Sequence, residues 1–254
     1  MSTDRFSLEG KVALVSGGSR GIGEAIAHGL AEQGARVIVS SRDVAACQVV
    51  ADAINAKGGE AVAMTCHAGV QSDIDAVFKA IDEQFGRIDI LINNGATNPY
   101  YGPMAQTPEE AFDKTMTVNV KGPFMMTSAA VERMVKQGGG SIVTVASITA
   151  FNPSTYMGIY AMSKAALVSM TRTFANEYSK HNVRVNALAP GLTDTKFTEA
   201  LQSDEKMTQQ ILKSIPARRM ALPEDMVGGV LYLVSDAAAY TTGTTLVIDG
   251  GMIS

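Results

Sequence analysis

The chain has 254 residues, of which 46% are hydrophobic and 18% are charged, so it can bury a sizeable core in one compact unit. Lysine and arginine are scattered along a chain of formal net charge −4, and no basic stripe is available to neutralise nucleic-acid phosphates. The sequence has no apolar run of about 18 residues and no signal-peptide pattern at its start. We therefore expect a cytoplasmic protein without nucleic-acid or membrane partners.

Seven short apolar segments alternate with longer segments of helical period. The predicted strands are 11–17, 35–40, 61–66, 88–94, 141–147, 183–190 and 245–249, and the predicted helices are 20–33, 43–57, 71–85, 108–136, 158–179 and 223–235. Most strands are apolar at consecutive positions, which is typical of parallel strands covered on both faces. The alternation predicts an α/β fold with a doubly wound parallel sheet of seven strands flanked by helices, in a single domain of residues 1–254.

A glycine-rich loop, "SGGSRGIG", lies between the first predicted strand and the first predicted helix. Gly17, Gly21 and Gly23 permit a tight turn and close approach of the backbone to a pyrophosphate, and the helix N-terminus offers unpaired N–H groups. A nucleoside triphosphate P-loop would need Lys-Ser/Thr after the last glycine, whereas this chain has Glu24 and Ala25. The loop therefore predicts a dinucleotide site.

The second predicted strand ends in "VIVSSRD", where dinucleotide sites for NAD(H) usually carry an acidic residue. Ser41 and Arg42 occupy that position, and a hydroxyl with a guanidinium suits a ribose 2′-phosphate. Arg20, inside the glycine loop, offers a second positive charge. NADP(H) is the predicted cofactor. The alternative is NAD(H), with both arginines simply solvated and Asp43 binding the ribose hydroxyl.

In "IYAMSKAAL", Tyr160 and Lys164 are four residues apart and project from one face of a predicted helix. The ammonium is expected to lower the pKa of the phenol toward the range useful for acid/base catalysis. Ser147 ends the fifth predicted strand and can hold a substrate oxygen at the carboxyl edge of the sheet. Tyr156 has no lysine four residues further on, so Tyr160 is the predicted acid/base. Cys47 and Cys66 lack metal-ligand spacing, so we expect free thiols and no metal.

From about Leu8 to Met252 the sequence resembles the short-chain dehydrogenases/reductases, whose glycine motif is Thr-Gly-x-x-x-Gly-x-Gly; Ser16 replaces the threonine here. The resemblance implies a Rossmann-type fold and a catalytic tetrad of Asn119, Ser147, Tyr160 and Lys164. Asn119 would interrupt a helix and anchor a water that leads to the lysine.

The same resemblance implies the cofactor contacts. "CHAG" puts His67 beside the adenine, "NNGA" replaces Asn-Asn-Ala-Gly at the adenosine ribose, and "PGLTDT" would lie over the nicotinamide. The implied cofactor-binding residues are Gly17, Ser19, Arg20, Gly21, Ile22, Gly23, Ser41, Arg42, His67, Ala68, Asn94, Gly95, Tyr160, Lys164, Pro190, Gly191, Thr193 and Thr195.

Residues 194–216 are predicted to form a polar helical insertion, at the place where the resemblance implies a substrate lid. The predicted pocket favours an apolar or aromatic ketone over a heavily charged metabolite, and it draws on Thr97, Tyr101, Ile148, Phe151, Asn152, Tyr156 and Phe197. The tracts "SSR", "CHAG" and "NPYYGP" resemble carbonyl, dicarbonyl and retinal reductases of the family.

These patterns predict an NADP(H)-dependent oxidoreductase that transfers a hydride between the cofactor and a ketone, aldehyde or secondary alcohol. One alternative is a 3-oxoacyl-carrier-protein reductase, which would need a basic surface for its acidic carrier. Another is a dinucleotide sensor without catalysis, which would not need the tetrad. The resemblance also implies a homotetramer, or a homodimer, formed through helices 108–136 and 158–179 and the C-terminal "TTGTTLVIDGGMIS".

Overall fold

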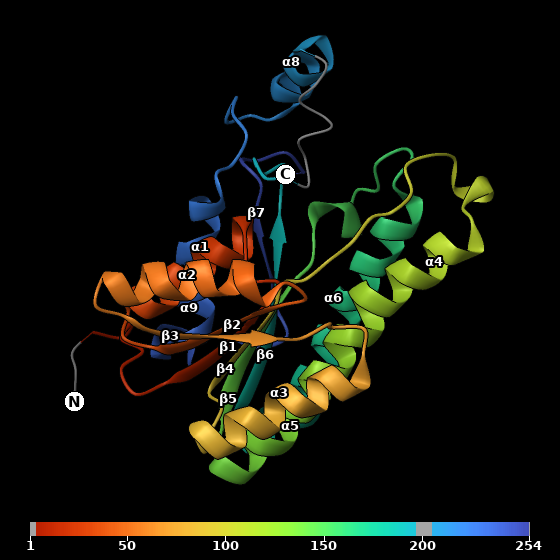
Figure 1. The fold of residues 1–254 in the computed structure, drawn as a ribbon. Coiled ribbons are helices and arrows are strands. Elements are labelled where there is room, and N and C mark those ends of the chain that lie inside the picture. The colour runs from red at the N-terminus through yellow and green to blue at the C-terminus, as the bar shows by residue number, and fades with distance from the viewer. Residues whose placement is uncertain (1–3, 197–204, 254) are drawn as a thin grey trace.

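The computed structural model describes residues 4–196 and 205–253. Its parallel sheet has seven strands in the order β3-β2-β1-β4-β5-β6-β7, with helices on both faces (Figure 1). The strands are β1 Val12–Ser16, β2 Arg36–Ser41, β3 Glu60–Thr65, β4 Ile90–Asn93, β5 Gly140–Val145, β6 Val183–Pro190 and β7 Thr245–Ile248. Each predicted strand overlaps one of these, and the predicted doubly wound, Rossmann-type fold is confirmed.

Two layers of helices cover the sheet. Helices α1, α2 and α9 lie on one face, and α3, α5 and α6 lie on the other (Figure 1). The helices are α1 Gly21–Glu32, α2 Val44–Ala56, α3 Gln71–Gln84, α4 Glu109–Met116, α5 Gly122–Gln137, α6 Gly158–Tyr178, α8 Glu205–Ser214 and α9 Val227–Val234. Among residues 4–196 and 205–253, none of the helices combines the length and the apolar composition that a membrane span requires.

One predicted helix, 108–136, is divided in the structure. A π-helical turn, Thr117–Lys121, separates α4 from α5. The predicted helix 223–235 likewise begins with a 3₁₀ turn, Pro223–Met226, before α9. The π-helical turn contains Asn119, and π-helical turns often occur at functional sites.

The apolar strands are explained by the two helix layers. All five residues of β1 are buried, and Ala13 and Val15 belong to the core cluster under α1 and α2. Val12 and Leu14 belong to the cluster under α3 and α5. Successive residues of a strand point to opposite faces, so a strand covered on both faces needs apolar side chains at consecutive positions.

The carboxyl ends of the strands meet along one edge of the sheet. Ser16 pairs with Asn93, and Asn93 pairs with Thr144 near the end of β5. The glycine loop, the segment after β4 and the Ser147 segment therefore leave the sheet side by side. Ligands of doubly wound sheets bind at this edge.

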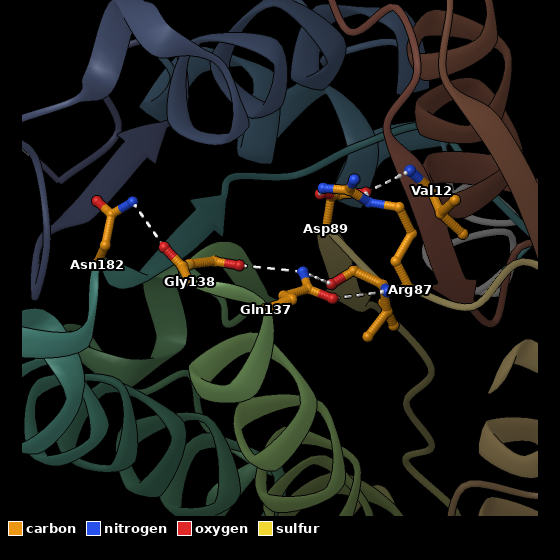
Figure 2. A network of polar contacts seen from close by, with 8 residues as sticks. Val12, Arg87, Asp89, Gln137, Gly138 and Asn182 are labelled. Carbon is orange, nitrogen blue, oxygen red and sulfur yellow. Dashed lines mark hydrogen bonds and ion pairs between the residues drawn. The ribbon is translucent and has the colours of Figure 1, made fainter.

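A polar network ties the opposite, amino edge of the sheet together (Figure 2). The buried Asp89 carboxylate accepts the N–H of Val12 at 2.9 Å and two hydrogen bonds from the Arg87 guanidinium at 2.9 and 2.6 Å. The side chain of Gln137 bonds both the N–H and the C=O of Ile88, at 3.3 and 2.6 Å. These contacts join β1, the start of β4 and the end of α5, far from the carboxyl edge.

Candidate active site

The predicted acid/base and its partners lie together at the carboxyl edge. Helix α6 begins at Gly158, which places Tyr160 in its first turn and Lys164 one turn later. The Tyr160 phenol is hydrogen-bonded with the Ser147 side chain, and Lys164 Nζ lies 5.5 Å from the centroid of the Tyr160 ring. Tyr160 and Ser147 are each 9% exposed and Lys164 is 2% exposed. Three members of the predicted tetrad therefore form one buried cluster.

The expectation that Lys164 lowers the pKa of Tyr160 is wrong for this cluster. Burial raises the pKa of Tyr160 to about 12, and the hydrogen bond with Ser147 offsets only part of that rise. Burial also lowers the pKa of Lys164 to about 7, while its Nζ donates to the Val145 carbonyl at 2.7 Å. Removal from water disfavours the charged form of each group. The phenol is therefore protonated at neutral pH, as a proton donor must be.

Asn119, the fourth member, joins the segment after β4 to α6. Its Oδ1 accepts the Thr97 N–H at 2.8 Å, and its Nδ2 donates to the Thr97 carbonyl at 2.9 Å and to Ser163 Oγ at 3.1 Å. Ser163 in turn donates to the Tyr160 carbonyl at 2.7 Å. The amide donors of Asn119 are thus both used by protein groups, and they position the first turns of α6.

Two of these groups were missed by sequence reasoning. Ser163 gave no signal, because a helical serine commonly bonds only its own backbone. The Val145 carbonyl, which accepts the hydrogen bond of Lys164, could not be predicted either, because a backbone carbonyl has no sequence signature. Its only hint was the place of Val145 at the end of β5, two residues before Ser147.

The glycine loop packs so closely against the segment after β4 that side chains do not fit. A Cβ on Gly23 would lie 2.2 Å from the Gly17 carbonyl oxygen, and a Cβ on Gly17 would lie 2.7 Å from Gly95 Cα. Gly17 and Gly21 also have φ of +64° and +57°, the left-handed region that favours glycine. The loop therefore presents bare backbone at the N-terminus of α1, which fits a pyrophosphate.

Ser16 and Asn94 hold this cradle in shape. Ser16 Oγ accepts the N–H of Asn94 at 3.2 Å and that of Gly95 at 3.5 Å, while Asn94 Nδ2 donates to the Gly17 carbonyl at 2.9 Å. The hydroxyl that replaces the family's threonine therefore links β1 to β4. The order Asn-Gly in "NNGA" is accommodated here, since Gly95 meets Gly17 backbone to backbone.

The segment after β6 faces the glycine loop from the other side. A Cβ on Gly21 would lie 3.3 Å from the Thr195 methyl carbon, so Thr195 lies against the loop. Thr193 is buried, and its hydroxyl donates to the Gly191 carbonyl at 3.1 Å. Gly191 N–H donates to the Ile248 carbonyl at 2.9 Å, which fixes the segment on β7.

The residues that would choose between NADP(H) and NAD(H) lie at the ends of the glycine loop and β2. Arg20 and Arg42 are both exposed, and neither forms a salt bridge with any residue that the structure describes. One oxygen of the Asp43 carboxylate caps α2 by accepting the Ala46 N–H at 3.1 Å. Ser41 Oγ bonds the N–H and C=O of Asp43 at 3.1 and 3.0 Å. Asp43 is thus engaged by its own helix, while both guanidinium groups are available to a phosphate.

His67 lies at the predicted adenine end. Its Nδ1 accepts the Gly69 N–H at 3.0 Å, so its proton is assigned to Nε2. It borders a hollow of about 580 Å³ with Glu109, Glu110, Asp113, Lys114, Thr117 and Val118. The next residue, Ala68, packs tightly against the start of α5, since a Cβ on Gly122 would lie 2.2 Å from the Ala68 carbonyl oxygen.

The predicted substrate residues differ in their placement. The rings of Tyr101 and Tyr156 meet edge to face with centroids 5.8 Å apart, and each ring is about half exposed. Ile148 is buried, whereas Phe151 and Asn152 are exposed. Phe197 lies outside the described residues, as do residues 197–204 of the predicted lid, whose remainder contains α8.

Both thiols are buried, Cys47 beside Ser41 and Cys66 at the end of β3. Burial raises the pKa of Cys66 to about 12 and that of Cys47 above its ordinary value. Within the described residues, no three histidine, cysteine or acidic side chains are grouped as a metal site would require.

Comparison with known proteins gives matches over nearly the whole chain. Residues 17–253 match the family model described as enoyl-(acyl carrier protein) reductase. The chain is 42% identical to dehydrogenase/reductase SDR family member 4 of Oryctolagus cuniculus over 249 residues, covering 98% of this chain and 96% of that protein.

Solved structures give the same result. A short-chain type dehydrogenase/reductase from Mycobacterium marinum has a TM-score of 0.93 and 38% identity, covering 98% of each chain. A gluconate 5-dehydrogenase from Burkholderia cenocepacia J2315, in complex with NADP and tartrate, has a TM-score of 0.94 and 28% identity, covering 98% of this chain and 97% of that one.

Proposed function

The chain belongs to the short-chain dehydrogenase/reductase family, and on that premise we propose that it is an NADP(H)-dependent oxidoreductase acting on ketones, aldehydes or secondary alcohols. The observation that carries the proposal is the buried cluster of Ser147, Tyr160 and Lys164 beside the glycine cradle. A sensor that only binds a dinucleotide has no use for a buried lysine next to a buried phenol, because burying either group is costly.

The residues around the cradle fit a dinucleotide that carries a 2′-phosphate. The bare backbone at Gly17, Gly21 and Gly23 suits the pyrophosphate, and the exposed guanidinium groups of Arg20 and Arg42 suit the extra phosphate. The Burkholderia relative is a complex with NADP, which supports the same cofactor here. When bound, the nicotinamide supplies or takes up the hydride. Pro190, Gly191, Thr193 and Thr195 would hold the nicotinamide end.

The chain's own residues would manage the proton. In reduction, the protonated Tyr160 phenol donates to the substrate oxygen, while the Ser147 hydroxyl holds that oxygen in place. Lys164 would hold the nicotinamide ribose, and Asn119 would support proton resupply. In oxidation Tyr160 would accept the proton instead and must begin as the phenolate.

For the substrate we propose an apolar or aromatic ketone. Tyr101, Tyr156, Phe151 and Ile148 support an apolar pocket, to which Thr97 and Asn152 add polar edges. We also propose that Phe197 contacts the substrate and that residues 194–216 serve as the substrate lid. Both would belong to a single domain of residues 1–254. Gluconate, the substrate class in the name of the Burkholderia relative, is the natural polar competitor in an assay.

We further propose a cytoplasmic homotetramer, or a homodimer. An apolar hollow of about 420 Å³ supports a protein contact at helices α4 to α6, and it is lined by Met116, Thr117, Val120, Lys121, Phe124 and Met170. Phe124 is 52% exposed there, so the hollow and this side chain together offer apolar surface to a second copy of the chain.

The experiment is an initial-rate assay of NADPH and NADH oxidation with aliphatic, aromatic and vicinal-diketone substrates, together with gluconate in the oxidation direction. Wild type should prefer NADPH and an aromatic ketone. Tyr160→Phe should lose 10²–10⁴-fold in kcat, roughly the contribution of a general acid, without loss of NADPH binding by fluorescence. Reduction of only acyl thioesters would favour the carrier-protein alternative, and cofactor binding without any turnover would favour the sensor.

A further inference from the structure

The backbone of Tyr156 is in a conformation that its side chain disfavours. Its φ is +67°, in the left-handed region, where a bulky residue is strained. The other non-glycine residues with positive φ in the described ranges are Asn182, whose short polar side chain tolerates that region, and Arg218. Glycine would adopt the Tyr156 conformation without strain, so the local fold does not require a tyrosine. The contacts of Tyr156 in the folded chain must therefore offset the strain.

Two contacts hold Tyr156 in place, and both come from the segment after β4. Gly102 N–H donates to the Tyr156 carbonyl at 3.0 Å, and the ring of Tyr101 meets the ring of Tyr156 at an interplanar angle of 60°. The partner segment is itself shaped for the contact. Tyr100 Oη donates to the Pro103 carbonyl at 3.1 Å, and a Cβ on Gly102 would lie 2.5 Å from that hydroxyl.

The pair, which we call the Tyr101–Tyr156 clasp, joins the two segments that flank the reacting groups. Residues 151–157 connect the turn that begins at Ser147 to the helix that carries Tyr160. Residues 97–103 begin at Thr97, the residue held by Asn119. Tyr101 and Tyr156 are 55% and 48% exposed although their rings meet, which leaves surface for a further contact.

We propose that the Tyr101–Tyr156 clasp makes Tyr156 a specificity-determining residue that selects substrates with a flat aromatic or conjugated group on the carbonyl carbon. The inference rests on the proposed function and specifies the substrate class of the same site. Aromatic rings prefer edge-to-face or offset contacts with other rings, and each such contact is worth about 2- to 10-fold in binding beyond burial alone. A puckered saturated ring of equal size gains burial without that preference.

The test compares acetophenone with cyclohexyl methyl ketone, two ketones of similar size whose rings are flat and puckered. The measured quantity is the ratio of their kcat/KM values with NADPH. Wild type should favour acetophenone. Tyr156→Phe should keep the ratio, because it keeps the ring, and Tyr156→Gly should lower it about fivefold or more while easing the backbone. Tyr101→Leu should lower it in the same direction.

Tyr240→Leu is the matched control, since Tyr240 is a fully exposed tyrosine that follows the 3₁₀ turn Asp236–Ala238. It should leave the ratio unchanged. The thermal midpoint gives a readout without substrate: Tyr156→Gly should unfold at a higher temperature than Tyr156→Ala, because only glycine adopts φ of +67° without strain.

An unchanged ratio in both Tyr156→Gly and Tyr101→Leu overturns the specificity proposal and leaves the oxidoreductase function standing. If Tyr156→Gly does not fold, Tyr101→Leu alone decides. If wild type reduces no carbonyl compound at all, the proposed function fails, and the specificity proposal fails with it.

Discussion

Replacing Arg42 with alanine should weaken the selection of NADPH over NADH. Arg42 and Arg20 are exposed and lack salt-bridge partners among the described residues, so neither must break a contact to meet a phosphate. A hydrogen bond to a charged group contributes roughly 1.5–3 kcal/mol, and solvent screening favours the lower end here. Since about 1.4 kcal/mol is a factor of ten, we expect about a tenfold loss in kcat/KM for NADPH per arginine removed.

The assay measures kcat/KM for NADPH and for NADH in wild type, Arg42→Ala, Arg20→Ala and the double variant. NADH values should stay within about twofold, because NADH lacks the phosphate that these arginines would contact. Raising the ionic strength should lower NADPH efficiency more in wild type than in the double variant, since exposed charges are screened. Arg172→Ala serves as a control, because Arg172 is an exposed arginine on α6, at the other face of the sheet.

Equal losses for NADPH and NADH, or an NADH preference in wild type, would refute this reasoning. Asp43→Ala separates the alternatives further. If Asp43 only caps α2, its removal should lower stability by about 0.5–2 kcal/mol and leave the cofactor ratio unchanged. A selective loss of NADH use in that variant would return Asp43 to the ribose.

Other predictions concern the cradle, the buried lysine and the amino edge. Gly23→Ala should abolish cofactor binding in fluorescence titrations, because the new Cβ would meet the Gly17 carbonyl oxygen. The matched control is Gly228→Ala on α9, where a Cβ meets no atom; it should raise the free energy of unfolding by about 0.5–1 kcal/mol. Between pH 7 and 8 the unfolded chain binds the Lys164 proton that the folded protein releases at about 7, so stability without cofactor should rise with pH in wild type and not in Lys164→Met. Asp89→Asn should lower the free energy of unfolding by about 1–3 kcal/mol, because it weakens the hydrogen bonds to Arg87. The denaturation midpoint should fall and kcat should not change, since this network lies far from the carboxyl edge.

Each of these has an outcome that contradicts it. Normal cofactor affinity in Gly23→Ala would mean that the loop can open without cost. A parallel rise in thermal midpoint for wild type and Lys164→Met would assign the pH dependence to another group. A loss of kcat in Asp89→Asn with the midpoint unchanged would place that network in the reaction and not in the stability of the sheet.

Much of the fold could be predicted from the sequence, because the relevant signals are local. The apolar runs that become β1 to β7 have period and length typical of buried strands, and the glycine loop between β1 and α1 needs only neighbouring residues to be recognised. The i, i+4 spacing of Tyr160 and Lys164 puts both side chains on one helix face in any fold. The interruption of helix 108–136 at Asn119 followed only from the family resemblance, because a π-helical turn has no clear local signal.

The electrostatics and the long-range contacts were decided by the tertiary structure alone. The pKa of Tyr160 depends on how completely its surroundings remove water, and that depends on packing between β5, α6 and the Ser147 turn. The link from Thr97 through Asn119 and Ser163 joins three segments that are distant in sequence. The Tyr101–Tyr156 clasp likewise depends on contact between two loops, in which Gly102 N–H donates to the Tyr156 carbonyl and the two rings meet. Patterns along the chain predict which residues form strands and helices and which side chains share a helix face. Burial and contacts between distant segments exist only once the chain has folded.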